Sequence, residues 1–187
     1  MKRVVFLDRD GVINEDLDFV HKKEDFRFIL RSIEGLKLLK NYGLIVVTNQ
    51  GGIARGYYTE EDMHSLHKHM IEELEKEGVL LLGIYYCPHH SEKGIGKYKI
   101  NCGCRKPKSG MLKQAVEEHN IDIGKSWTIG DKLRDIKSGK NVGCRTILVR
   151  TGQGSKEDVK NSKIKPDFIV DDLYEAAKLI LREDGNN

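Results

Sequence analysis

The sequence has no hydrophobic run long enough to cross a membrane. A bilayer-spanning helix needs roughly 20 apolar residues, and the short run after Lys2 and Arg3 soon gives way to aspartates. An excess of one charge is also missing, because the formal net charge is only +3. We therefore expect a monomeric, cytoplasmic protein that binds neither membranes nor nucleic acid.

Repeats and low-complexity linkers are absent as well, and 187 residues with 39% hydrophobic composition suit one core and one domain, residues 1–187. Apolar runs alternate with amphipathic segments, which is the βαβ pattern of a parallel sheet covered by helices. Five or six strands are expected among 4–7, 44–48, 83–86, 127–129, 146–149 and 168–170. Helices are expected from Ser32 to Gly43, Thr59 to Gly78, Ser109 onward, Asp131 to near Gly143 and Leu173 to Leu181, with a frayed tail at 183–187.

Two carboxylates follow the first apolar run, at Asp8 and Asp10, and Gly11 comes directly after them. This run of branched and aromatic residues is typical of a buried parallel strand. Ligands in open α/β sheets bind at the carboxyl ends of strands, where a glycine lets the backbone turn sharply. Taken alone, the tetrapeptide is equally consistent with an ordinary polar turn.

Other expected strands also end in polar residues, and strand ends of a parallel sheet meet along one edge. Clustered carboxylates repel one another unless a cation lies between them, and hard oxygen ligands favour Mg²⁺. A magnesium ion held this way keeps positions for water and phosphate, which favours phosphoryl chemistry. The converging residues are Asp8, Asp10, Thr48, Asp131, Lys132 and Asp135.

Two close Cys/His pairs lie in the middle of the chain: Cys87 with His89, and Cys102 with Cys104. Three cysteines and one histidine match a structural Cys₃His zinc set, and the glycines and lysines between the pairs suit a loop that a metal holds together. His90 could replace His89 as the ligand. A reducing compartment disfavours disulfides, and three cysteines cannot all pair with one another.

A cationic segment, 105–108, follows the second pair. If Arg105 and Lys106 face the strand-end crevice, they would neutralise a phosphate dianion. Alone, the segment reads as a solvated basic loop. Cys144 precedes an apolar strand and is interpreted as a core residue.

These residues resemble the four ordered motifs of the haloacid dehalogenase (HAD) superfamily of phosphohydrolases. The matching positions are 8–12 for the nucleophile motif, Thr48 for the second, Lys106 for the third, and Gly130, Asp131 and Asp135 for the fourth. The whole chain is similar to the zinc-containing branch of heptose 1,7-bisphosphate 7-phosphatases and histidinol phosphatases. Segments 48–57 and 102–107 resemble the heptose enzymes more closely. Phe19 and Gly51 depart from the Tyr and Ser that are common there.

The resemblance implies a Rossmann-like three-layer α/β/α fold with a mostly parallel sheet. The short spacing between Asp8 and Thr48 leaves no room for a large cap domain. The site would then be open, shaped by a zinc-binding loop insertion at 87–104 and by the loop at 16–21.

The resemblance also implies a Mg²⁺-dependent phosphatase that removes the 7-phosphate of D-glycero-D-manno-heptose 1,7-bisphosphate, in the synthesis of activated heptose for lipopolysaccharide or S-layer glycans. Asp8 would be the nucleophile, Asp10 the general acid and base, and Thr48 and Lys106 ligands of the transferring phosphate. Mg²⁺ would be held by Asp8, Asp10 (through its backbone carbonyl) and Asp131, and Zn²⁺ by Cys87, His89, Cys102 and Cys104. The substrate candidates are Asp16, Leu17, Asp18, Phe19, Asn49, Gln50, Gly51, Arg55, Arg105 and Lys132.

Three alternatives remain at this point. Histidinol phosphate could be the substrate on the same fold and mechanism. A scaffold protein without turnover should lack a catalytic residue, yet none is missing. A zinc-ribbon nucleic-acid binder would need a basic face with stacking aromatics, whereas Tyr85, Tyr86 and Tyr98 are scattered.

Overall fold

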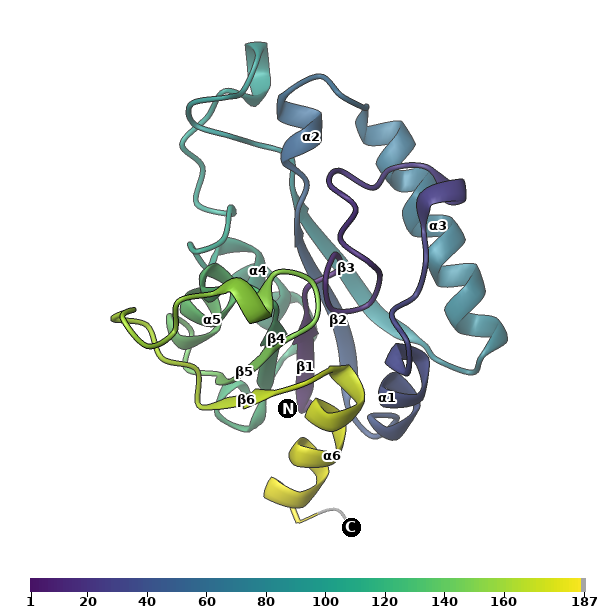
Figure 1. Ribbon diagram of the computed structural model, residues 1–187, viewed down its shortest axis with the longest axis vertical. Helices are drawn as coiled ribbons and strands as arrows, with labels where there is room; N and C mark the ends of the chain where they lie inside the picture. The colour runs from purple at the N-terminus through teal and green to yellow at the C-terminus, as the bar shows by residue number, and fades with distance from the viewer. Residues whose placement is uncertain (186–187) are drawn as a thin grey trace.

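The computed structural model describes residues 1–185, and its six strands form one parallel sheet. The strand order is β3-β2-β1-β4-β5-β6, with chain crossovers that place helices on both faces (Figure 1). The strands are β1 (Val4–Leu7), β2 (Gly43–Asn49), β3 (Leu81–Cys87), β4 (Trp127–Gly130), β5 (Arg145–Val149) and β6 (Phe168–Val170). The expected three-layer α/β fold with a parallel sheet is confirmed.

Six α-helices and four short 3-10 helices join these strands within the described residues. The α-helices are α1 (Ser32–Leu38), α2 (Gly51–Ala54), α3 (Glu60–Lys76), α4 (Gly110–His119), α5 (Leu133–Lys140) and α6 (Leu173–Glu183). The 3-10 helices are η1 (Lys23–Asp25), η2 (Gly96–Tyr98), η3 (Ile123–Lys125) and η4 (Gly154–Lys156). None of the helices in residues 1–185 combines the length and hydropathy needed to span a bilayer.

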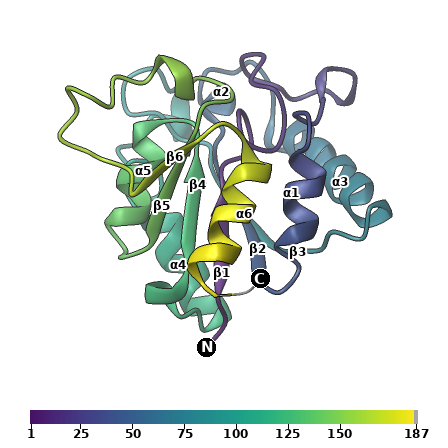
Figure 2. The same ribbon diagram turned by 60° about the horizontal axis from the view of Figure 1, so that its bottom comes forward.

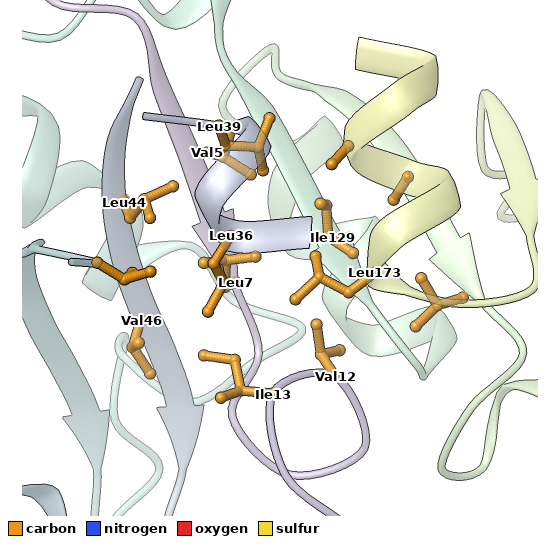
Figure 3. Packing of buried hydrophobic residues seen from close by; sticks show 14 of the residues in the cluster. Val5, Leu7, Val12, Ile13, Leu36, Leu39, Leu44, Val46, Ile129 and Leu173 are labelled. Atoms are coloured by element: carbon orange, nitrogen blue, oxygen red, sulfur yellow. The ribbon is translucent and has the colours of Figure 1, made fainter. Parts of the chain in front are cut away.

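Alternate side chains of β1 fill two separate cores. Val5 and Leu7 pack in the larger one, under α1, α3 and α6 (Figure 3), while Val4 and Phe6 pack on the opposite face, against α4. Figure 2 shows α1 and α6 on one side of the strands and α4 and α5 on the other. Because β1 is buried on both faces, its four residues read as one continuous apolar run.

The order of the strands places the chemistry at one point of the sheet edge. The chain winds outward in opposite directions from β1 and β4, which lie next to each other. Crevices at such switch points are where ligands bind in open α/β sheets. Asp8 follows β1 and Asp131 follows β4, so the two carboxylates start from neighbouring strands.

Some predicted helix boundaries were wrong. Ser32 does not cap α1: it is already the first helical residue, and the residue before it, Arg31, adopts a left-handed conformation with φ 65°. The helix also stops at Leu38, because Gly43 is needed as the first residue of β2, where it pairs with Val4.

Helix α5 differs from the prediction at its start, and α4 differs in how its cap is made. Helix α5 begins at Leu133 and ends at Lys140, since the carboxylate of Asp135 accepts the backbone N–H of Lys132 and fixes that residue as the cap. Ser109 does occupy the cap position of α4, but its side chain makes no capping hydrogen bond. The Thr59–Asp62 capping box is confirmed.

Two segments were missed or only partly described. The one-turn helix α2 was not predicted, and β3 extends beyond 83–86 at both ends. The predicted fraying of 183–187 is wrong at its first residue, because Glu183 still belongs to α6. Residues 186–187 of that tail lie outside the described residues.

Candidate active site

A cavity of about 190 Å³ opens where the strands end, above β1 and β2. Its walls come from four parts of the chain that are distant in sequence: the 8–19 loop, the 48–58 segment, Arg105 and the start of α5. The lining residues are Asp8, Asp10, Asp16, Asp18, Phe19, Thr48, Asn49, Gln50, Gly51, Arg55, Tyr58, Arg105, Lys132 and Arg134.

Four buried charged residues form what we call the catalytic floor: Asp8, Lys106, Asp131 and Asp135. The Lys106 Nζ lies 3.0 Å from Asp8 Oδ1 and 2.7 Å from Asp135 Oδ1, and it donates to the Val47 carbonyl at 2.7 Å. All three ammonium protons are therefore engaged. Burial alone would raise the pKa of Asp8, but the positive charges of Lys106 and Arg134 lower it below its usual value.

Three carboxylates of the catalytic floor converge. One oxygen each from Asp8, Asp131 and Asp135 lies within 4.8 Å of the others. The carboxylate of Asp10 is outside this group. Asp135 uses one oxygen on Lys106 and the other on the Lys132 backbone N–H at 3.0 Å, which leaves Asp8 and Asp131 with the freer oxygens.

Asp131 is fully buried, and one of its two carboxylate oxygens has no hydrogen-bond partner. Its Oδ2 accepts the backbone N–H of Gln153 at 2.9 Å, whereas its Oδ1 is buried without a hydrogen bond. Burial, followed by the negative charges of Asp8 and Asp135, raises the pKa of Asp131 to about 7. A buried carboxylate oxygen of this kind, beside a second carboxylate, fits a hard cation such as Mg²⁺.

Gly11 allows this close approach of the two strand ends. Its φ is +87°, and a Cβ atom there would come within 2.3 Å of Asp131 Oδ2. Both the left-handed backbone and the missing side chain are therefore needed for the 8–14 turn to pack against Asp131.

The Asp10 side chain is held from one side. Its Oδ1 accepts from Arg9 Nη2 at 2.9 Å, Arg9 Nε at 3.2 Å and Asn14 Nδ2 at 3.0 Å. Its Oδ2 has only a long contact of 3.3 Å with Gln50 Nε2 and belongs to a residue that lines the cavity. Arg9 is fully buried and also contacts His67, whose pKa burial and the Arg9 charge lower to about 3. His67 is therefore neutral near pH 7.

The end of β2 carries a chain of polar contacts. Tyr58 donates its hydroxyl proton to Gln50 Oε1 at 2.6 Å, and Gln50 Nε2 donates to Thr48 Oγ1 at 2.8 Å. Asn49 binds both backbone groups of Lys106, at 3.0 and 3.1 Å. Asn49 thus lines the cavity, but its side-chain amide is already hydrogen-bonded to the Lys106 backbone and positions that residue.

The rim of the cavity contains the remaining predicted substrate residues, with the exception of Leu17. Lys132 Nζ donates to Asp16 Oδ2 at 2.8 Å, which joins the start of α5 to the first loop. Asp18 and Phe19 both have a φ of 57°, an uncommon conformation for residues with side chains. Leu17 is 52% exposed and does not line the cavity.

Two lining residues, Tyr58 and Arg134, were not predicted from the sequence. Arg134 lies between the motif residues Asp131 and Asp135, so its place on the first turn of the helix could have drawn attention to it. Tyr58 had no comparable signal, because its position depends on α2.

The second polar cluster lies beside the cavity. We call Cys87, His89, Cys102 and Cys104 the Cys/His cluster; their ligand atoms all lie within 4.8 Å of one another and the cysteines are free thiols. The Sγ–Sγ distances of 3.5 and 3.2 Å are near the separation of about 3.8 Å expected for two sulfurs on one tetrahedral zinc. The residue types and spacing therefore fit Zn²⁺.

The ring of His90 is not part of this cluster. Its Nδ1 lies 3.2 and 3.1 Å from the backbone N–H groups of Glu92 and Lys93, so it accepts hydrogen bonds within its own loop. Of the two histidines, the geometry favours His89. Cys144 is buried in the core under α4, as predicted, and is not one of the four grouped ligands.

Arg105 connects the Cys/His cluster to the cavity. Its Nη1 donates to the backbone carbonyl of His89 at 3.0 Å, while the side chain lines the cavity. The 88–101 loop itself leaves β3 and passes beside α2 (Figure 1), where Ile95 donates its backbone N–H to the Ala54 carbonyl.

Comparison with known proteins supplies the family. A chain of Pasteurella multocida, the D-glycero-beta-D-manno-heptose-1,7-bisphosphate 7-phosphatase, is 46% identical over 183 residues, covering 96% of this chain and 97% of the relative. This chain belongs to the heptose-1,7-bisphosphate 7-phosphatase family. The phosphatase of that name from Escherichia coli K12 is 40% identical over 96% of this chain and 94% of its own length. The HAD-hydrolase-like family model matches residues 103–176.

Solved structures agree with this assignment. The D,D-heptose 1,7-bisphosphate phosphatase from B. bronchiseptica, complexed with magnesium and phosphate, superposes with a TM-score of 0.85 and 29% identity, covering 97% of this chain and 99% of that chain. The resemblance to the heptose branch of the HAD superfamily is thereby confirmed.

Proposed function

We propose that this protein is a Mg²⁺-dependent phosphatase that removes the 7-phosphate of D-glycero-D-manno-heptose 1,7-bisphosphate and leaves heptose 1-phosphate. The observation that carries the proposal is the pairing of Asp8 and Asp131 at the switch point, where Asp131 Oδ1 is buried without a hydrogen bond. Relatives at 40–46% identity over the whole chain are named for this reaction. The four free cysteines suit the reducing cytoplasm, where we place the reaction.

The metal ligands follow from the donor set. Asp8 and Asp131 would hold Mg²⁺ with carboxylate oxygens, and Asp10 would contribute its backbone carbonyl, since its carboxylate is bound to Arg9 and Asn14. When bound, the ion supplies positive charge that offsets the repulsion between the nucleophile and the phosphate. That repulsion is about 4 kcal/mol for one pair of unit charges 4 Å apart at an effective dielectric constant near 20.

The protein side chains then divide the reaction between two carboxylates. Asp8 attacks phosphorus, the bond from phosphorus to the sugar oxygen breaks, and Asp10 donates a proton to that oxygen from Oδ2, its freer atom. In the second half, Asp10 takes a proton from the water that hydrolyses the aspartyl-phosphate. Thr48, which lines the cavity, binds an oxygen of the phosphoryl group, and Lys106 offsets the negative charge of the reacting groups from its place beside Asp8.

The remaining polar residues orient the sugar and its second phosphate. Arg105, Arg55 and Lys132 supply positive charge around the cavity, and Asp16, Asp18 and Gln50 supply acceptors for sugar hydroxyls. The Cys/His cluster would hold a structural Zn²⁺, and the backbone carbonyl of its ligand His89 accepts from Arg105, which holds Arg105 at the cavity.

Phosphate release measured side by side tests the proposal. We expect heptose 1,7-bisphosphate, assayed as both anomers, to be hydrolysed far faster than histidinol phosphate at equal enzyme and saturating Mg²⁺. The ³¹P spectrum of the product should keep the anomeric phosphate. Preferential hydrolysis of histidinol phosphate, or loss of the anomeric phosphate, would overturn the assignment.

A further inference from the structure

Arg134 is a charged residue of the cavity to which the mechanism above gives no role. It is the second residue of α5 and lies between Asp131 and Asp135 in the chain. Within residues 1–185, its guanidinium has neither a hydrogen bond nor an ion pair within 4 Å, and its Nε is buried without a partner. Every other arginine of the cavity, Arg55 and Arg105, donates to a backbone carbonyl.

The charges around Arg134 explain why it stays ionised without touching a carboxylate. Burial by itself would lower the pKa of Arg134, but the negative charges of Asp135, Asp8 and Asp131 raise it. These carboxylates attract the guanidinium from beyond ion-pair distance. The space between Arg134 and Asp8 belongs to the cavity, which both residues line.

A second cation also faces Arg134. Burial and then the charge of Arg134 lower the pKa of Arg105, so the two guanidiniums repel each other. Two partly buried arginines that line one cavity with Asp8, and that have unused N–H donors, form a site for an anion that would relieve this repulsion.

We propose that Arg134 binds the phosphoryl group that is transferred to Asp8, donating its free N–H groups to non-bridging oxygens of the phosphate. A bisphosphate substrate has two phosphate groups that Arg134 could bind. The one that is transferred is favoured, because Arg134 and the nucleophile Asp8 line the same cavity. The inference rests on the proposed phosphatase activity, but not on the identity of the sugar.

Inorganic phosphate is the direct probe. With Mg²⁺ present, Arg134→Met should weaken the binding of phosphate, measured by calorimetry, by about 10- to 100-fold, the range expected for hydrogen bonds to a charged group. Arg134→Lys keeps the charge but loses the planar fork, so it should recover part of the affinity. Arg27→Met, which removes an exposed arginine outside the cavity, is the matched control and should bind phosphate like the wild type.

Kinetics and stability distinguish the alternatives. The kcat/KM of Arg134→Met should fall by a similar factor for heptose 7-phosphate and for the 1,7-bisphosphate, with the unfolding temperature unchanged. Unchanged phosphate affinity of Arg134→Met would overturn the inference. A fall in kcat/KM for the bisphosphate alone would then indicate that Arg134 binds the remote phosphate, and a lower unfolding temperature would indicate a structural role. If Arg134→Met fails to fold, the same measurements are made on Arg134→Lys. Wild-type phosphate affinity together with wild-type kcat/KM in Arg134→Lys would also overturn the inference.

The outcome is separable from the proposed function. A wild-type protein that binds phosphate through Arg134 but does not hydrolyse the heptose bisphosphate would contradict the substrate assignment and leave this inference standing.

Discussion

The catalytic floor and the Cys/His cluster are two polar sites, about equally rich in metal-binding side chains, that the fold supports in different ways. Asp8 and Asp131 extend from buried neighbouring strands, and their positions follow from the register of the sheet. The cluster joins the end of β3 to a loop whose only regular element in 88–101 is the single-turn η2. Most of its side chains are half-buried.

The difference shows which part of the site needs a metal in order to form. The sheet positions the buried carboxylates of the catalytic floor, and these carboxylates repel one another. A cation bound between them would relieve this repulsion. The 88–101 loop is mostly exposed, so a zinc ion bound to the Cys/His cluster would take the place of a core. Removal of Mg²⁺ should therefore abolish activity and leave the fold intact, whereas removal of Zn²⁺ should loosen the 88–101 loop.

The largest expected effect comes from the nucleophile. Asp8→Asn should reduce phosphate release to background, by more than about 10³-fold, because an amide cannot form the aspartyl-phosphate. The fold should remain, as judged by circular dichroism. Asp25→Asn, an exposed carboxylate on η1, is the control and should be fully active. Near-normal turnover of Asp8→Asn would remove Asp8 from this role.

Cys102→Ser should break the other region. The variant is expected to lose about one equivalent of zinc per chain and to lose activity by about 10- to 100-fold, as Arg105 is no longer held. Hydrogen exchange should speed up in 88–101 and stay slow in β1 and β4. Cys144→Ser removes a buried thiol outside the cluster, and its zinc content should match the wild type. Equal zinc in both variants would show that the cluster is not the metal site.

The pH dependence of stability sharpens the comparison for the catalytic floor. The pKa of Asp131 is raised to about 7, so Asp131 stabilises the metal-free fold fully below its unfolded pKa near 4, and this contribution is lost as the pH rises through 7. The loss is at most about 4 kcal/mol. Urea unfolding in Mg²⁺-free buffer at pH 5.5 and 8 measures the upper half of this loss, about 2 kcal/mol. Asp131→Asn should flatten this dependence, and a wild-type protein that is equally stable at both pH values would contradict the account.

The smallest expected effect belongs to Tyr58. Tyr58→Phe removes the donor to Gln50, whose other end binds Thr48, so kcat/KM should fall about 5-fold and stability by about 1–3 kcal/mol. Tyr57→Phe removes a hydroxyl from an exposed neighbour and is the control. If both variants behave alike, the Tyr58–Gln50 contact does not position Thr48.

Much of the fold was predictable, because its signals are local or periodic. Continuous apolar runs marked the buried strands, and polar residues at their ends indicated the sheet edge where Asp8 and Asp131 meet. The boundaries of α1 and α5 were not predictable, since they depend on the left-handed Arg31 and on the Asp135 carboxylate. No pattern in the sequence indicates the backbone conformation of Arg31 or the hydrogen bond of the Asp135 carboxylate.

Within the site, sequence reasoning found residue types but not directions. It could not tell that Asn49 binds the Lys106 backbone or that Leu17 does not line the cavity. It also passed over Arg134, because a lone arginine on a helix is ordinarily a solvated side chain. Only the packed structure shows that its Nε is buried without a partner.

Anomalous diffraction from crystals soaked in Mn²⁺ and phosphate tests the central claim most directly, since Mn²⁺ takes the same oxygen ligands as Mg²⁺. The account predicts one strong peak at about 2.0–2.2 Å from carboxylate oxygens of both Asp8 and Asp131, with phosphate bound beside it. A peak that contacts neither carboxylate, or none at the end of β1 and β4, would contradict it.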